Sequence, residues 1–191
     1  MKYFAHETAI IDKDCHIGNG TKIWHFSHIM SNSKVGENCN IGQNVVISPD
    51  VILGKNCKVQ NNVSIYTGVI CEDDVFIGPS AVFTNIINPR SSVVRRGEYL
   101  KTYISHGATI GANATVICGN KIETFAFIGA GAVITKNVPA YALVIGNPAR
   151  QIGWMSEYGH RLHFNEDQIA ICPESKETYE LQNGLVKKIV S

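Results

Sequence analysis

Residues 41–64 read IGQNVV ISPDVI LGKNCK VQNNVS, four consecutive hexads that each begin with a large aliphatic residue. The same six-residue spacing runs without interruption from Ile11 to Phe83, and a compact residue such as Cys39 or Val63 follows four positions after each large one. A helix repeats every 3.6 residues and a strand every two, so neither alone explains a strict period of six. A short fixed period is typical of a solenoid, in which stacked coils share one core.

Each hexad can supply one short strand and one corner, and three hexads close one coil. Residues eighteen apart then lie in adjacent coils, about 4.8 Å from one another. Burial of one large inward side chain per hexad contributes about 1.5–3 kcal/mol. The corner positions carry residues such as Asn38, Asn56 and Asp74, which tolerate the left-handed backbone of a sharp turn. The sequence therefore predicts an all-β fold, a parallel β-helix of hexapeptide repeats.

The period breaks after Asn85 and resumes at Ile104, so we expect residues 86–103 to form a loop extruded from one coil. This segment contains four basic side chains and one acidic side chain, namely Arg90, Arg95, Arg96, Lys101 and Glu98. The whole chain has 17 basic and 16 acidic residues, so positive charge is concentrated here. Insertions in solenoids often carry the functional site. The loop therefore predicts an anion-binding site, with a tolerated surface insertion as the alternative.

The repeat ends near Gly146-Asn147-Pro148, a run that interrupts both strand and helix. We expect a solenoid over residues 1–150, with the inserted loop 86–103, and a small appendage over residues 151–191. Within the appendage, the spacing of apolar residues predicts a short helix from Ile152 to Leu162. Asn183-Gly184 between two apolar runs predicts a β-hairpin.

The composition excludes several classes of partner. A net charge of +1 argues against a nucleic-acid surface. No apolar run approaches the ~20 residues of a membrane span, and the first residues show no secretory signal. Cys15, Cys39 and Cys57 fall in the small inward position, where free cysteine acts as a small hydrophobe. We expect a cytoplasmic protein that does not bind membranes.

Several motifs resemble a known group. IGAGAVITK at 128–136 and VIGNPAR at 144–150 resemble the ending of left-handed β-helix acyltransferases that use acetyl-coenzyme A. IWHF at 23–26, QNNVSIY at 60–66 and FTNIINPR at 83–90 are similar to bacterial sugar-nucleotide N-acetyltransferases of surface-polysaccharide (O-antigen) synthesis. Within that group, the motifs most resemble enzymes that act on UDP-2-acetamido-3-amino-2,3-dideoxy-glucuronate. The resemblance implies a left-handed coil, a homotrimer with active sites between subunits, acetyl-CoA as co-substrate, and transfer of acetyl to a sugar 3-amino group.

The resemblance also suggests catalytic residues. Asn85 matches the asparagine of the Phe-Thr-Asn motif, and its amide is expected to hold the sugar amine or the thioester oxygen. A general base is the second requirement of acyl transfer to an amine, and His25 and His28 are the candidates. The departing coenzyme thiolate is the alternative proton acceptor. A corner asparagine or a solvated histidine without a catalytic role is the plain alternative for each residue.

Substrate contacts follow from charge and from the family pattern. Arginine pairs two oxygens of a phosphate or carboxylate, and the expected contacts of the sugar nucleotide are Gln43, Asn61, Tyr66, Glu72, Arg90 and Arg95. Small residues would let pantetheine lie close to the backbone, while cations would meet its phosphates. The residues expected to bind coenzyme A are Gly111, Ala130, Gly131, Ala132, Lys136 and Arg150.

Three other functions remain open from the sequence. Enzymes acting on dTDP-3-amino-3,6-dideoxyhexoses share many of these motifs, so the nucleotide and the C6 group are undecided. Zinc hydratases of the γ-carbonic-anhydrase type have the same fold, but their histidine spacing is absent, and we expect no metal. A scaffold without catalysis is the third alternative, and a lack of affinity for coenzyme A would favour it.

Overall fold

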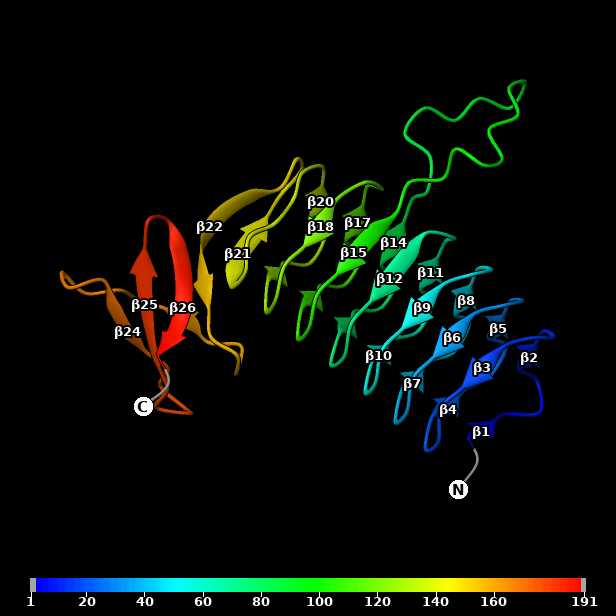
Figure 1. Cartoon of the computed structure of the whole chain (residues 1–191), viewed down its shortest axis with the longest axis horizontal. Coiled ribbons are helices and arrows are strands. Elements are labelled where there is room, and N and C mark those ends of the chain that lie inside the picture. Colours follow the sequence, from blue (N-terminus) through cyan, green and yellow to red (C-terminus); the bar gives the residue numbers. More distant parts are fainter. Residues whose placement is uncertain (1–2, 190–191) are drawn as a thin grey trace.

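The computed structural model describes residues 3–189, so the first two residues of the expected solenoid and the last two of the expected appendage lie outside it. Within this range the chain winds into a three-sided stack of coils whose long axis runs from the N-terminal to the C-terminal end (Figure 1). Pairs such as Lys58↔Asn40 and Lys58↔Phe76 are parallel and eighteen residues apart. The predicted parallel β-helix of hexapeptide repeats is confirmed.

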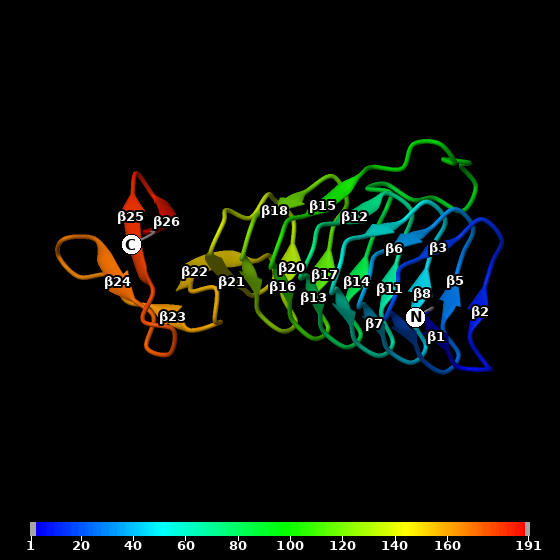
Figure 2. The ribbon, with the colours of Figure 1, turned by 60° about the horizontal axis from the view of Figure 1, so that its bottom comes forward.

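Three sheets form the faces of the stack, which are distinct in Figure 2. The first face contains β1 (Phe4–Ala5), β4 (Lys22–Ile23), β7 (Asn40–Ile41), β10 (Lys58–Val59), β13 (Phe76–Ile77), β16 (Thr109–Ile110), β19 (Phe127–Ile128), β21 (Ala142–Ile145), β22 (Arg150–Met155) and β23 (Arg161–Leu162). The second face contains β2 (Ile10–Ile11), β5 (His28–Ile29), β8 (Val46–Ile47), β11 (Ser64–Ile65), β14 (Val82–Phe83), β17 (Thr115–Val116) and β20 (Val133–Ile134). The third face contains β3 (His16–Ile17), β6 (Lys34–Val35), β9 (Ile52–Leu53), β12 (Val69–Cys71), β15 (Thr102–Ile104) and β18 (Lys121–Ile122).

Three corners join these faces, and their names are used below. The first corner, between the first and second faces, holds residues 24–27 and their equivalents in other coils. The second corner holds residues 30–33 and their equivalents, and the third corner holds residues 36–39 and their equivalents. Asn38, Asn56 and Asp74 have φ values of 57°, 53° and 60°, so the predicted left-handed corners are confirmed.

The core runs along the axis of the stack. The large inward residues of successive coils, such as Ile41, Val59 and Ile77, are fully buried, and so are the small inward residues Cys57 and Val75. Outward residues of the same strands, such as Lys58, face solvent. The alternation of one inward and one outward residue per two-residue strand is the reason that the six-residue period is visible in the sequence.

The extruded loop leaves the stack between β14 and β15 (Figure 1). Phe83 and Ile104, neighbours in the hexad series, are separated by 21 positions instead of six. The expected range 86–103 is two residues too long, because Thr102 and Tyr103 already belong to β15. Thr102 is fully buried and pairs with Val69, so the ladder hydrogen bonds hold it in the coil.

The expected helix from Ile152 to Leu162 is wrong, and residues 3–189 contain no helix. β22 runs antiparallel to β21, and β23 runs antiparallel to β22. β21 ends the stack, and its free backbone groups are satisfied by β22, which outweighs a weak helical spacing that includes Gly153. No helix long and apolar enough to cross a bilayer occurs in the described part of the chain.

The appendage ends in an antiparallel sheet of β24 (Ile169–Ile171), β25 (Thr178–Gln182) and β26 (Leu185–Ile189). The predicted hairpin is confirmed, with Asn183 and Gly184 at φ 51° and 73° between β25 and β26. This sheet has its own small core, centred on fully buried Tyr179 and Cys172. It lies at the end of the molecule opposite the N terminus (Figure 1).

Candidate active site

The neck of the extruded loop lies at the second corner and contains Asn85. The backbone carbonyl of Asn85 accepts a hydrogen bond from the N–H of Leu100 at 3.0 Å, which closes the neck. The side chain of Asn85 is half-buried, and its carboxamide makes no hydrogen bond to another of residues 3–189. The amide therefore retains its full capacity to bind a ligand.

A cavity of about 650 Å³ lies directly against this neck. Its lining combines cationic and apolar side chains of the loop with the base residue Asn85, and the lining residues are Asn85, Ile86, Pro89, Arg90, Ser91, Val93, Val94, Arg95, Arg96 and Tyr99. The structure thus brings together three predicted site residues, Asn85, Arg90 and Arg95. The apolar lining residues could not be predicted, because residues in an aperiodic loop give no signal of which side they face.

The charges of the loop are only partly neutralised. Arg95 donates to Glu98 through Nη1 at 2.9 Å, while its buried Nε has no hydrogen-bond partner within residues 3–189. Arg90 and Arg96 are exposed and form no ion pair within the same range. An anion entering the cavity would meet unpaired guanidinium groups, which bind phosphate or carboxylate oxygens well.

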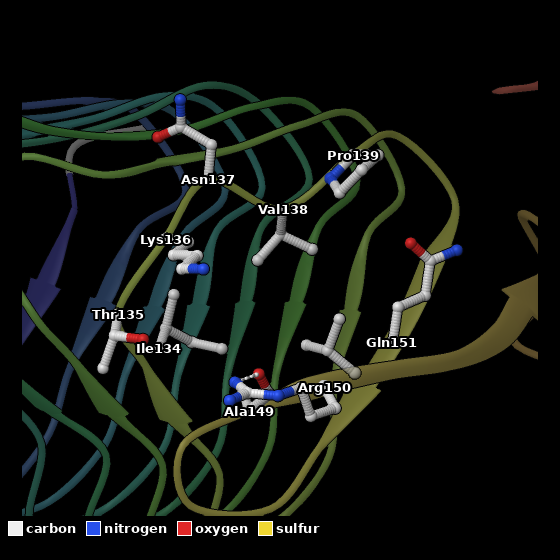
Figure 3. A pocket seen from close by; sticks show the side chains of 10 residues that line it. Ile134, Thr135, Lys136, Asn137, Val138, Pro139, Ala149, Arg150 and Gln151 are labelled. Carbon is white, nitrogen blue, oxygen red and sulfur yellow. Dashed lines mark hydrogen bonds between the residues drawn. The ribbon is translucent and has the colours of Figure 1, made fainter. Parts of the chain in front are cut away.

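A second, smaller cavity of about 280 Å³ lies at the C-terminal end of the second corner (Figure 3). It forms where the last coil turns back into β22, and its polar lining residues are Thr135, Lys136, Asn137, Arg150 and Gln151. Lys136 and Arg150, predicted to meet the same ligand, do line one cavity. Arg150 donates to the carbonyl of Ala149 at 3.0 Å, which orients the guanidinium beside it. Two cations on one small cavity suit a phosphate group.

A polar stripe runs along the first corner, which lies across the second face from the neck of the loop. It consists of His25, Gln43 and Asn61, each eighteen residues after the one before. The backbone N–H of Asn44 bonds the carbonyl of His25 at 3.0 Å, which fixes the spacing of adjacent coils. Asn61 accepts the N–H of Gln43 through Oδ1 at 2.9 Å, so this side chain already supports the corner. The carboxamide of Gln43 remains exposed.

The comparisons with known proteins agree with this architecture. A model of the bacterial transferase hexapeptide family (six repeats) matches residues 14–49, and a model of the hexapeptide repeat of succinyl-transferase matches residues 34–67 and 104–136. A curated relative, dTDP-3-amino-3,6-dideoxy-alpha-D-galactopyranose 3-N-acetyltransferase of Aneurinibacillus thermoaerophilus, is 43% identical over 187 residues. The match covers 98% of this chain and 95% of the relative.

The chain belongs to the hexapeptide-repeat sugar-nucleotide N-acetyltransferases. It is an acyltransferase. Solved structures support the fold of this N-acetyltransferase. The acetyltransferase domain of PglB from Neisseria gonorrhoeae has a TM-score of 0.53 at 20% identity, over 78% of this chain and 57% of that one. A hexapeptide transferase family protein from Anaplasma phagocytophilum has a TM-score of 0.57 at 19% identity, over 82% and 81% of the two chains.

In one copy of the N-acetyltransferase, the predicted site residues do not all converge. His28 lies on the second face, where its Nε2 contacts Asp12 Oδ1 at 2.9 Å. Tyr66 lies at the second corner, one coil before the neck of the loop. Glu72 lies at the third corner and accepts the N–H of His106 at 2.8 Å, a bond that joins adjacent coils. A site that used Asn85, His25 and Glu72 together would need more than one subunit.

Three of the four small residues predicted to meet coenzyme A have local structural explanations, and the fourth, Ala130, is exposed. A Cβ on Gly111 would lie 2.6 Å from the backbone nitrogen of Ala130, so close stacking of coils requires this glycine. Gly131 has φ 69°, which favours glycine at that corner. The side chain of Ala132 is fully buried in the core and does not reach the surface. Among the expected coenzyme contacts, Lys136 and Arg150 therefore have the best support from the geometry.

Residues that could hold a metal do not gather in the described part of the chain. No group of three His, Cys, Asp or Glu side chains is placed to coordinate an ion within residues 3–189 of one copy. His25 instead stacks on His6, with ring centroids 3.5 Å apart. No observation in this copy favours the zinc-hydratase alternative.

Proposed function

We propose that this N-acetyltransferase moves the acetyl group of acetyl-CoA to the 3-amino group of a dTDP-linked 3-amino-3,6-dideoxyhexose. The proposal rests on the 43% identity to a relative of that substrate class, which extends over 98% of the chain. It replaces the UDP-linked uronate, which the sequence motifs alone favoured, with the dTDP-linked sugar.

The chemistry needs few groups, because a thioester is already activated. The neutral amine attacks the carbonyl carbon, the C–N bond forms, and the oxyanion collapses with cleavage of the C–S bond. One proton must leave the nitrogen, and the departing thiolate can take it to give free coenzyme A. Holding the two reactants in line supplies much of the rate acceleration.

Asn85 is assigned to the reacting centre. Its carboxamide oxygen can accept a hydrogen bond from the sugar amine and point the nitrogen lone pair at the thioester. The half-buried position at the neck and the unused carboxamide support this role. His28 is the better placed of the two candidate bases, since Asp12 fixes its ring at 2.9 Å.

The two cavities suit the anionic groups of different substrates. Arg90 and Arg96 in the loop cavity suit the diphosphate of the sugar nucleotide, while Lys136 and Arg150 suit the phosphates of coenzyme A. These positions are compatible with a left-handed homotrimer that binds both substrates between subunits. Apolar loop side chains that are strongly exposed in one copy, 65% for Ile87 and 82% for Val94, support burial against a second copy. A cytoplasmic location is part of the same proposal.

The test is a substrate comparison. Purified protein is incubated with acetyl-CoA and either dTDP-3-amino-3,6-dideoxygalactose, its glucose epimer, or UDP-2-acetamido-3-amino-2,3-dideoxy-glucuronate, and free thiol is followed with a chromogenic reagent. We expect the dTDP sugars to give the higher kcat/KM, together with an amide at C3 by NMR. Faster turnover of the uronate would reverse the substrate assignment, and no thiol release with any amino sugar would remove the proposed function.

A further inference from the structure

Phe26 at the first corner has a backbone conformation that its residue type disfavours. Its φ is 59°, in the left-handed region where a bulky side chain is strained. The equivalent positions of other coils hold small or amide residues, namely Asn44, Asn62, Ser80, Asn113 and Gly131. The ring of Phe26 is nevertheless 65% exposed, so burial within its own chain does not explain the choice of phenylalanine.

Two other aromatic residues with the same backbone show the contrast. Phe125, with φ 53°, packs edge-on against His106 at 5.2 Å and stacks on Tyr141 at 5.6 Å. Tyr141, with φ 61°, also contacts Tyr179 and donates a hydrogen bond to Glu157. These side chains are held by packing at the third corner. Within residues 3–189, Phe26 has only one ring contact, a tilted one with its chain neighbour His25 at 6.1 Å.

The surroundings of Phe26 form a rigid aromatic surface. The indole of Trp24 donates to Asn40 at 2.8 Å and contacts Phe4 at 5.6 Å. His25 stacks on His6 with centroids 3.5 Å apart, and its ring lies nearly parallel to the indole of Trp24. The N–H of Phe26 is held by Thr8 Oγ1 at 3.0 Å. Fixed rings with an exposed face are the usual platform for a planar ligand.

Polar groups beside the rings indicate the kind of ligand. Gln43 lies one coil beyond His25, and its exposed carboxamide offers a donating NH2 group beside an accepting carbonyl oxygen. Nδ1 of His25 is buried and has no hydrogen-bond partner within residues 3–189. The imide edge of thymine or uracil presents an N–H between two carbonyl oxygens, which a carboxamide can pair in two-point fashion.

We propose that the exposed ring of Phe26, with His25 and Gln43 beside it, binds the pyrimidine base of the nucleotide sugar by stacking and edge recognition. The inference rests on the proposed function only in taking a nucleotide sugar as the ligand. It assigns His25 to binding of the base instead of proton transfer. It also assigns the strained corner to substrate recognition. The phosphates of the nucleotide sugar would then be bound by the loop of a neighbouring subunit.

The decisive variant is Phe26→Asn, which installs the residue that the same corner uses in other coils. Because asparagine tolerates a positive φ, the variant should melt at the same temperature as the wild type or higher. Its Kd for dTDP and for thymidine, measured by titration calorimetry, should rise about tenfold or more, as expected for loss of one stacked base. Phe26→Trp should retain binding, since it keeps a stacking face.

Phe125→Asn is the matched control. It changes the same residue type at the same backbone conformation, but its ring is packed against His106 and Tyr141. We expect this variant to melt at a lower temperature and to bind dTDP as the wild type does. Inorganic pyrophosphate, which has no base, should bind the wild type and Phe26→Asn with the same Kd.

Three results from binding and light scattering would overturn the inference: no binding of dTDP to the wild type, an unchanged Kd for dTDP in Phe26→Asn, or a smaller oligomer in Phe26→Asn. The last result would make Phe26 a subunit contact instead. Acetyl transfer is assayed separately. If Phe26→Asn turns over with an unaltered KM for the nucleotide sugar, the inference fails and the proposed function stands. If dTDP binding depends on Phe26 but no amino sugar is acetylated, the proposed function fails and the inference stands.

Discussion

Asn85 is the residue on which the proposed chemistry depends most. Its carboxamide is free at the neck of the loop, beside the cavity that holds Arg90 and Arg95. Replacement by alanine removes the group that orients the amine, so we expect Asn85→Ala to lower kcat by about 10²-fold, as for loss of one positioned polar group. The melting temperature should stay within a degree or two, since no side-chain hydrogen bond within the described chain is lost.

Ser92→Ala serves as the control for that variant, because Ser92 is exposed in the same loop and lies outside the lining of the cavity. Stopped-flow measurement of thiol release would compare the two. Equal rates for Asn85→Ala and the wild type would show that another residue positions the amine.

Lys136 and Arg150 carry the second residue-scale prediction. Each cation is exposed on the cavity of about 280 Å³, where a phosphate would bind. We expect Lys136→Met and Arg150→Met each to raise the KM for acetyl-CoA about tenfold, with little change in the KM for the sugar nucleotide. Lys121→Met, which removes an exposed cation on the third face paired with Glu123, is the control. A rise in only the KM for the sugar nucleotide would show that this cavity binds the sugar nucleotide instead of coenzyme A.

Single residues differ in how far their roles follow from sequence. The corners at Asn38 and Asn56 and the pairing of Lys136 with Arg150 could be predicted, because a strict period or a known ending fixes their places. Gln151 and Asn137 could not, since they join the cavity only through the return of β22 across the last coil. The role of Phe26 could not be predicted for another reason: its place in the hexad indicates a left-handed corner, but the period does not show that its ring is exposed.

At the scale of the element, close stacking of coils depends on glycines eighteen residues apart. A Cβ on Gly36 would overlap the carbonyl oxygen of Gly54 in the next coil. We expect Gly36→Ala to destabilise the fold by about 2 kcal/mol or more, because backbone must shift to make room. Gly159→Ala, at φ 78° with no atom within 4 Å of the added Cβ, should cost only about 1 kcal/mol of backbone strain. Urea denaturation measures both, and equal losses would contradict the stacking argument.

The C-terminal sheet depends on a cluster of ionisable groups. Lys188 contacts Glu157 at 2.8 Å and Glu177 at 2.5 Å, and the hydroxyl of Tyr179 donates to Glu177 at 3.1 Å. Hydrogen bonding to Lys188 lowers the pKa of Glu177, and the same bonds, first to Glu157 and then to Glu177, raise the pKa of Lys188. Burial raises the pKa of Tyr179 to about 12. The cluster therefore favours charged Glu177 and Lys188 beside a neutral phenol.

These pKa shifts predict a pH window for the C-terminal sheet. The contribution of Glu177 is present above its ordinary pKa and is lost as the pH falls below about 4. The contributions of Tyr179 and Lys188 are present below their ordinary pKa values and are lost as the pH rises above about 10. Amide exchange of residues 169–189 should therefore be slow at neutral pH, after correction for intrinsic rates, and faster at both extremes. Exchange in β7 and β10, whose inward residues are apolar, is the control; loss of protection near pH 7 would contradict this account.

Elements also differ in predictability. The strands of the stack followed from the period because each two-residue strand places one side chain in the core. The helix from Ile152 to Leu162 was a wrong prediction, since its spacing was weak and the open end of β21 offered β22 a complete set of backbone partners. The path of the loop had no periodic signal, and only its charge and its position at a corner were visible.

At the scale of the whole molecule, our proposal makes the solenoid the support and the interrupted coil the place of the chemistry. The loop projects from its own stack (Figure 1), and much of its apolar surface is exposed in one copy. Its removal should therefore leave the coils intact, because β14 and β15 are held by their neighbours β11, β17, β12 and β18. The family and the solenoid could be read from the sequence, whereas the distribution of site residues over three corners became visible only in the folded chain.

The most direct measurement replaces residues 86–101 by a single glycine, which restores the six-residue spacing between Phe83 and Ile104, and compares this variant with the wild type. Both are given acetyl-CoA and a dTDP-linked 3-amino-3,6-dideoxyhexose, and both are melted under the same conditions. We predict that the wild type releases coenzyme A and forms the C3 amide, while the variant keeps the solenoid's circular-dichroism spectrum and loses transfer. Undiminished transfer in the folded variant, or no transfer by the wild type, would contradict the central claim that the interrupted coil joins the acetyl donor to the amine.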